Sequence, residues 1–129
     1  RLKAVLPSEV AISSLTRMEI EYGVQLNPQG AAKISLVLEA LLSSIAVLPF
    51  QLPEAKAAGA IRAALRKQGT PIGAYDVLIA ATALVRGLIL VTSNTREFLR
   101  VSGLNLEDWR EGCGGKSGNH AAKIEIGNL

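Results

Sequence analysis

Short apolar runs of strand length alternate with helical segments along most of this chain, and that alternation limits the fold more than any other feature. Val10 to Ser14, Ile45 to Leu48 and Leu88 to Val91 are such runs. Continuous apolar runs, rather than alternating ones, are typical of parallel strands buried on both faces. We therefore expect an α/β domain with a mostly parallel sheet flanked by helices.

Four segments between these runs show helical spacing of apolar residues. They are Thr16 to Val24, Gly30 to Leu42, Pro53 to Lys67 and Gly73 to Arg86. The third has the clearest boundaries, because Pro53 suits an early helical position and Gly69 suits a helix end. Ligands of such folds bind beyond the carboxyl ends of the strands, so the residues just after each strand are the first candidates for chemistry.

Composition narrows the class of protein. The chain has 129 residues, enough for one domain, a formal charge of +3 and 4% aromatic residues. The small basic excess is only a weak indication of nucleic-acid binding. A single cysteine, Cys113, excludes an internal disulfide, and no apolar run reaches the roughly 18 residues of a membrane span. The cytoplasm is the expected location.

Two carboxylates stand out from the other acidic residues. Five of the eleven acids lie in turns, at helix starts or near the chain end, where solvation or the helix dipole explains them: Glu9, Glu54, Glu107, Asp108 and Glu111. Glu19 and Asp76 instead have apolar neighbours, where a carboxylate is costly unless it is paired or binds a metal ion. The alternatives are a helix-start acid for Asp76 and a solvated helix position for Glu19, shared with Glu21.

Three stretches carry a family resemblance. Gly69 to Ala81 reads GTPIGAYDVLIAA, Gly87 to Phe98 reads GLILVTSNTREF, and Ile12 to Gly23 reads ISSLTRMEIEYG. In this order, and with Gly103 to Trp109 after them, they resemble VapC-type PIN-domain ribonucleases over roughly residues 1 to 110. The resemblance implies a three-layer α/β fold in which carboxylates bind Mg²⁺ or Mn²⁺ at the carboxyl edge of the sheet.

The resemblance also implies roles for individual residues. Glu19 matches the second acidic position of the family and Asp76 the third. Asn94 stands where many relatives have Asp, and Glu97 is the alternative for this fourth position. Thr92 resembles a hydroxyl that orients this corner of the site, and Arg96 is a candidate phosphate contact. An ordinary strand-end threonine and a solvated arginine are the respective alternatives.

The chain departs from the family pattern at its beginning and its end. The family opens with a central strand that ends in Asp, and nothing before Glu9 is acidic here. We therefore expect an N-terminally truncated PIN-like domain over residues 1–110, in which the first Asp and the central strand are missing. Two buried strands are then left without their shared neighbour. Residues 111–129 are expected to form a flexible, Gly-rich tail outside the fold.

Two functions follow as expectations. The first is a Mg²⁺- or Mn²⁺-dependent endoribonuclease, a VapC-like toxin that hydrolyses RNA, with tRNA as the family's common substrate; the resemblance also implies a homodimer and a cognate antitoxin peptide. The second is a disabled PIN-like fragment that acts as an antitoxin-binding interaction module. Nucleophilic triads and histidine-rich zinc sites are excluded, because His120 and Cys113 are the only residues of their kinds and both lie in the tail.

Overall fold

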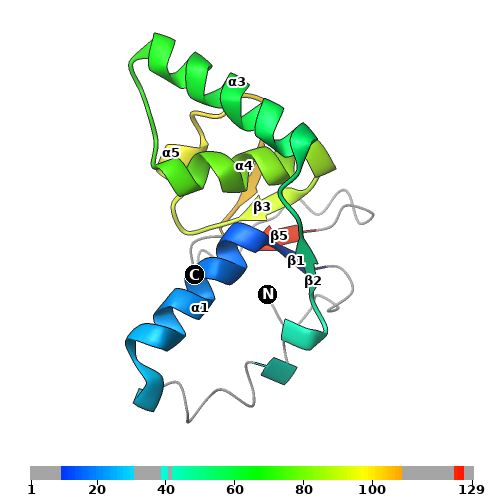
Figure 1. Ribbon diagram of the computed structural model, residues 1–129. Coiled ribbons are helices and arrows are strands. Elements are labelled where there is room, and N and C mark those ends of the chain that lie inside the picture. Colours follow the sequence, from blue (N-terminus) through cyan, green and yellow to red (C-terminus); the bar gives the residue numbers. More distant parts are fainter. Residues whose placement is uncertain (1–9, 31–38, 41, 109–123, 127–129) are drawn as a thin grey trace.

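A parallel five-stranded sheet forms the centre of the protein. The computed structural model describes residues 10–30, 39–40, 42–108 and 124–126. Among these, the strand order is β2-β1-β5-β3-β4, and all neighbouring strands are parallel (Figure 1). The strands are β1 Val10–Ser13, β2 Ala46–Leu48, β3 Ile89–Val91, β4 Asn105–Glu107 and β5 Ile124–Ile126. The expected α/β class is confirmed.

Three helices lie where the sequence predicts them, within one or two residues at each end: α1 Ser14–Leu26, α3 Leu52–Gln68 and α4 Ala74–Arg86. The short helix α5 Thr95–Phe98 was not predicted. Gly69 and Gly87 end α3 and α4 in the left-handed conformation, with φ of 76° and 66°, which other residues adopt only at a cost. Most of the helix predicted over residues 30–42 lies outside the described residues. None of the described helices is long and apolar enough to cross a membrane.

The centre of the sheet differs from the expectation. Ile124–Ile126 lies between β1 and β3, in register with Val10 on one side and Ile89 on the other. The expectation that β1 and β3 lack a shared neighbour is therefore wrong. So is the placement of these three residues outside the fold. The remaining tail residues, including Lys116, His120 and Lys123, lie outside the described residues.

The physical reason is main-chain hydrogen bonding. Val10, Ala11, Ile12, Leu90 and Val91 are all at most 6% exposed, so their unpaired N–H and C=O groups would have no water to bond. A third strand between β1 and β3 satisfies both ladders at once. The β-branched isoleucines at 124 and 126, in a tail otherwise rich in glycine, were the signal for a strand.

The core lies where α3 packs on α4 and α4 packs on the sheet (Figure 1). α4 contributes more to it than any other described element, and Ile79, Ala80, Ala81 and Ala83 are fully buried. Small side chains on this face bring α4 close to the strands beneath it. α4 therefore holds a well-defined position above β3.

An ion pair ties the start of α3 to the end of α4. Glu54 is 2% exposed, and its carboxylate lies 3.1 Å from a guanidinium nitrogen of Arg86. The same carboxylate accepts the main-chain N–H of Gln51 at 3.0 Å, which forms a capping box. Burial raises the pKa of this carboxyl, but N–H donation from the main chain and from Arg86 outweighs burial, so the pKa lies below its ordinary value.

Loss of the Glu54 charge is expected to destabilise the protein. Glu54→Gln should lower the free energy of unfolding at neutral pH by roughly 1 to 2 kcal/mol, because it removes the ion pair and weakens the cap. Since the folded pKa is lowered, the difference should be complete above the ordinary glutamate pKa and should vanish as pH falls through the folded pKa. Urea unfolding across this pH range measures it. The exposed Glu21→Gln is the control; an equal effect there would contradict the assignment.

The position of β5 has its own test. Glu125 is the middle residue of β5, in register with Ala11 and Leu90. Glu125→Pro removes a main-chain donor from the central strand and should cost roughly 1 to 3 kcal/mol of unfolding free energy. Glu125→Gln keeps this main-chain donor and should have little effect. If both variants unfold at the same urea concentration as the parent, the tail contributes no strand.

Candidate functional site

The carboxyl ends of three described strands meet at one edge of the sheet. β1 ends at Ser13, β3 runs into Thr92, and β4 ends at Glu107. The main-chain N–H of Thr92 donates to the carbonyl oxygen of Glu107 at 3.0 Å, which joins two of these ends directly. The chain passes from α4 to β3 through a short connection at Gly87, so α4 runs antiparallel to β3. Its first turn therefore lies on the side of the carboxyl edge (Figure 1).

A buried hydroxyl pair defines the junction between β1 and α1. Ser13 is 0% exposed and Thr16 is 1% exposed. Ser13 caps the helix: its Oγ accepts the main-chain N–H of Thr16 at 3.0 Å and donates to the Thr16 Oγ1 at 3.2 Å. The first turn of α1 is thus held firmly against the strand end. Glu19 lies one turn further along the helix.

The structure distinguishes Glu19, which the sequence singled out, from its neighbour Glu21. Glu19 is half-buried, whereas Glu21 is exposed. Glu21 accepts from Gln25 at 2.9 Å and from Arg17 at 3.4 Å, and these bonds, that of Gln25 first, lower the pKa of Glu21. Such spacing of four residues is ordinary for a solvated helix surface. Glu19 is therefore the better candidate of the two.

Asp76 lies half-buried in the first turn of α4, which packs against α1. Its side chain folds back over Gly73, the residue that caps the helix. A Cβ placed on Gly73 would stand 3.3 Å from an oxygen of the Asp76 carboxylate. Gly73 has φ of −57°, which any residue can adopt. The narrow space beside the Asp76 carboxylate, and not the backbone conformation, therefore favours glycine at this position.

The corner after β3 is organised by Thr92. This residue is 3% exposed, and its Oγ1 accepts the main-chain N–H of Asn94 at 3.0 Å. The Asn94 side-chain amide lies 3.5 Å from a carboxylate oxygen of Glu97, and both residues are half-buried. Arg96 is exposed on α5. Asn94 and Glu97 are thus neighbours, and their roles in a site stay predictions.

The candidate residues do not form a complete acidic cluster. No group of three or more His, Cys, Asp or Glu side chains able to hold a metal ion occurs among the described residues. Asn94 and Glu97 are in contact, while Glu19 and Asp76 come from helices that pack together. Each candidate offers oxygen atoms, the ligand type preferred by Mg²⁺ and Mn²⁺.

Two acidic residues near the end of β4 were expected to be solvated. Glu107 and Asp108 are half-buried at the same edge, and each makes a polar interaction. The sequence interpretation treated them as solvated because β4 itself was not predicted. The signal was Gly103, with φ of 84°, followed by alternating Leu104 and Leu106.

Known proteins share both the sequence and this architecture. The PIN domain family matches residues 1–104. The tRNA(fMet)-specific endonuclease VapC of Shigella flexneri is 46% identical over 101 residues, which cover 78% of this chain and 76% of the relative. That of Salmonella typhimurium is 42% identical over 79% of this chain and 76% of the relative.

Solved structures agree with these relatives. The DNA-bound VapBC of Salmonella typhimurium superposes with a TM-score of 0.70 at 42% identity, over 77% of this chain and 74% of that one. VapBC-1 of nontypeable Haemophilus influenzae gives 0.75 at 31% identity, over 85% and 82%. Shared motifs, a shared parallel sheet and extended sequence identity point the same way. The chain belongs to the PIN-domain family, within its VapC group.

Proposed function

We propose that this protein is a divalent-metal-dependent endoribonuclease of the VapC type, with tRNA as its substrate. The observation that carries the proposal is the pair of half-buried carboxylates Glu19 and Asp76, on helices that pack together at the carboxyl edge of a parallel sheet. The identity of 46% to a tRNA(fMet)-specific endonuclease supports the reaction and the substrate class.

The candidate residues suit a hard cation. Mg²⁺ commonly takes only one or two protein carboxylates and keeps water and substrate phosphate as further ligands, so a cage of three acids is not required. When bound, such an ion would activate water and stabilise negative charge on the scissile phosphate. Mg²⁺ and Mn²⁺ accept the same oxygen donors, and we propose either as the cofactor.

Each candidate residue has a distinct part in the proposal. Glu19 and Asp76 hold the ion, and Glu97 adds a negative charge directly or through water. Asn94 offers a carbonyl oxygen without charge, and its bond to Thr92 fixes the backbone from which that side chain extends. Arg96, exposed beside Glu97, is placed to contact an RNA phosphate.

Partners belong to the proposal as well. One matched structure, VapBC-5 of Mycobacterium tuberculosis, is described as a member of the VapBC family of toxin–antitoxin systems. This supports a cognate antitoxin peptide as the partner of this chain, and we propose a homodimer as its assembly. The expected cytoplasmic location is part of the same proposal.

A second function competes with the first. The described residues contain no group of three acids, and Asn94 is neutral. Both observations favour a PIN-like interaction module that binds an antitoxin without cleaving RNA. Metal-dependent cleavage separates the two functions.

Cleavage of a labelled tRNA pool in Mg²⁺ or Mn²⁺ tests the proposal. Glu19→Gln and Asp76→Asn should each lower the rate about 100-fold or more, because each removes a charge that binds the ion. Glu21→Gln makes the same chemical change two residues from Glu19 on an exposed position, and should cleave like the parent. Chelation should abolish activity. No cleavage by the folded parent with either metal would favour the interaction module.

Gly73 offers a subtler test of the Asp76 assignment. Gly73→Ala places a methyl group 3.3 Å from the Asp76 carboxylate without straining the backbone, so the carboxylate must shift by a few tenths of an ångström. We expect about a tenfold slower cleavage with little change in melting temperature. Gly23→Ala in α1, where nothing lies within 4 Å of an added Cβ, is the control. Unchanged cleavage by Gly73→Ala would argue against a precise role for Asp76.

A further inference from the structure

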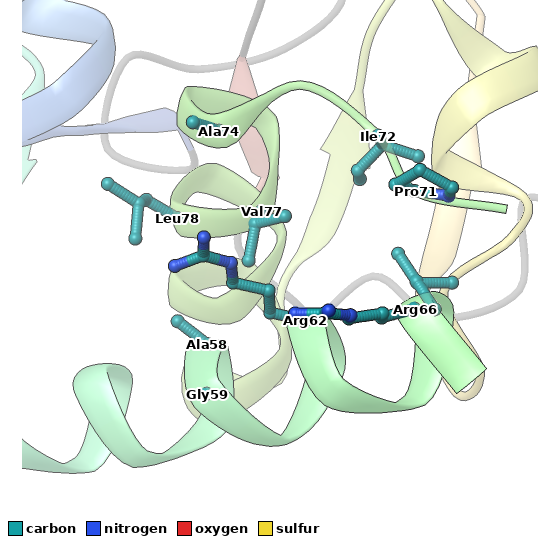
Figure 2. A pocket seen from close by; sticks show the side chains of 10 residues that line it. Ala58, Gly59, Arg62, Arg66, Pro71, Ile72, Ala74, Val77 and Leu78 are labelled. Carbon is teal, nitrogen blue, oxygen red and sulfur yellow. The ribbon is translucent and has the colours of Figure 1, made fainter. Parts of the chain in front are cut away.

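A cavity of about 640 Å³ opens between α3, α4 and the loop that joins them (Figure 2). Its walls are aliphatic or small: Ala58, Gly59 and Leu65 come from α3, and Val77 and Leu78 from α4. Ala58, Leu65 and Val77 are buried, so the inner surface of the cavity is apolar at these residues. A cavity of this size and composition accepts an apolar side chain or a small ligand.

Two arginines line the cavity, Arg62 and Arg66. Both are exposed, and neither side chain makes a hydrogen bond or ion pair with another residue in the described part of the chain. Arg86 and Arg100, by contrast, bond carbonyl oxygens of Pro49 and Pro71. Figure 2 shows Arg62 reaching from α3 toward Leu78. Among the described residues no acidic side chain lines the cavity, so the charge that these residues give it is positive.

The cavity is separate from the candidate catalytic site. Ala74, Val77 and Leu78 present one face of α4 to it. At 3.6 residues per turn, Asp76 lies about 160° around the helix from Leu78. A ligand in the cavity therefore contacts the face of α4 opposite to the catalytic candidate, and the cavity needs an explanation of its own.

We propose that this cavity binds an acidic peptide segment of a partner protein. An apolar side chain of the peptide enters the cavity, and its carboxylates pair with Arg62 and Arg66. Arginines four residues apart on one helix face lie close enough to bind neighbouring carboxylates, which guanidinium groups hold through paired hydrogen bonds. RNA fits less well, because the lining residues that the structure describes include no aromatic side chain to stack on a base.

Gly59 allows a test that leaves the fold intact. An added Cβ at this position has nothing within 4 Å. Gly59→Leu therefore extends into open space at the cavity wall, and leucine is a better helix former than glycine, so α3 should be retained. This variant blocks the apolar part of the site, whereas the arginine variants remove its charge.

The experiment measures binding of fluorescein-labelled probes to the full chain by anisotropy. One probe is a short peptide with leucine anchors flanked by glutamates, the second replaces each Glu with Gln, and the third is a single-stranded RNA of similar length. We expect the Glu peptide to bind about tenfold or more tightly than the Gln peptide. Arg62→Glu, Arg66→Glu and Gly59→Leu should each weaken binding to a similar degree.

Lys67→Glu is the matched control, because it makes the same charge change on α3 about 140° from Arg62. Its binding should equal that of the parent. Equal binding of the Glu and Gln peptides, or equal losses in Lys67→Glu and Arg62→Glu, would overturn the proposal. If the RNA probe binds the parent more tightly than the Glu peptide does, and Arg62→Glu and Arg66→Glu weaken that RNA binding, the cavity belongs to nucleic acid instead. A dimer that sedimentation detects in the parent and that Gly59→Leu dissociates would assign it to a second copy of this chain.

Discussion

Main-chain hydrogen bonding at the centre of the sheet is the constraint on which the rest of the structure depends. β1 and β3 are almost completely buried, and neither pairs with the other. β5 lies between them and joins the pair β2-β1 to the pair β3-β4 in one sheet. Without a strand in this place, the helices above the sheet would pack on two separate ribbons, and the strand ends would have no common edge.

The candidate site follows from this connected sheet. Since every strand is parallel, the carboxyl ends of β1, β3 and β4 fall on one edge, and α4 returns its first turn to the same edge. Glu19 and Asp76 thereby lie on helices that pack together at this edge, and Asn94 and Glu97 follow the end of β3. Buried hydroxyls then hold the local geometry, with Ser13 at the start of α1 and Thr92 at the end of β3.

α3 and α4 are joined by an ion pair at one end and are separated by a cavity further along. Glu54 at the start of α3 pairs with Arg86 at the end of α4, so their charges compensate each other. Further along, small residues such as Ala58 and Gly59 leave a cavity, and no carboxylate of the described residues pairs with Arg62 or Arg66. The same helix pair thus combines a structural ion pair with a surface whose charge is left for a partner.

Local patterns in the sequence determined the α/β class, the ends of α3 and α4 and the choice of Asp76, because apolar periodicity, glycine caps and motif order act over a few residues. Tertiary structure alone decided three other matters. It placed Ile124–Ile126 between β1 and β3, since strand pairing depends on which distant segment satisfies buried main-chain groups. It separated half-buried Glu19 from solvated Glu21, and it left Arg62 and Arg66 beside a cavity, because burial and charge compensation depend on neighbours that are remote in the sequence.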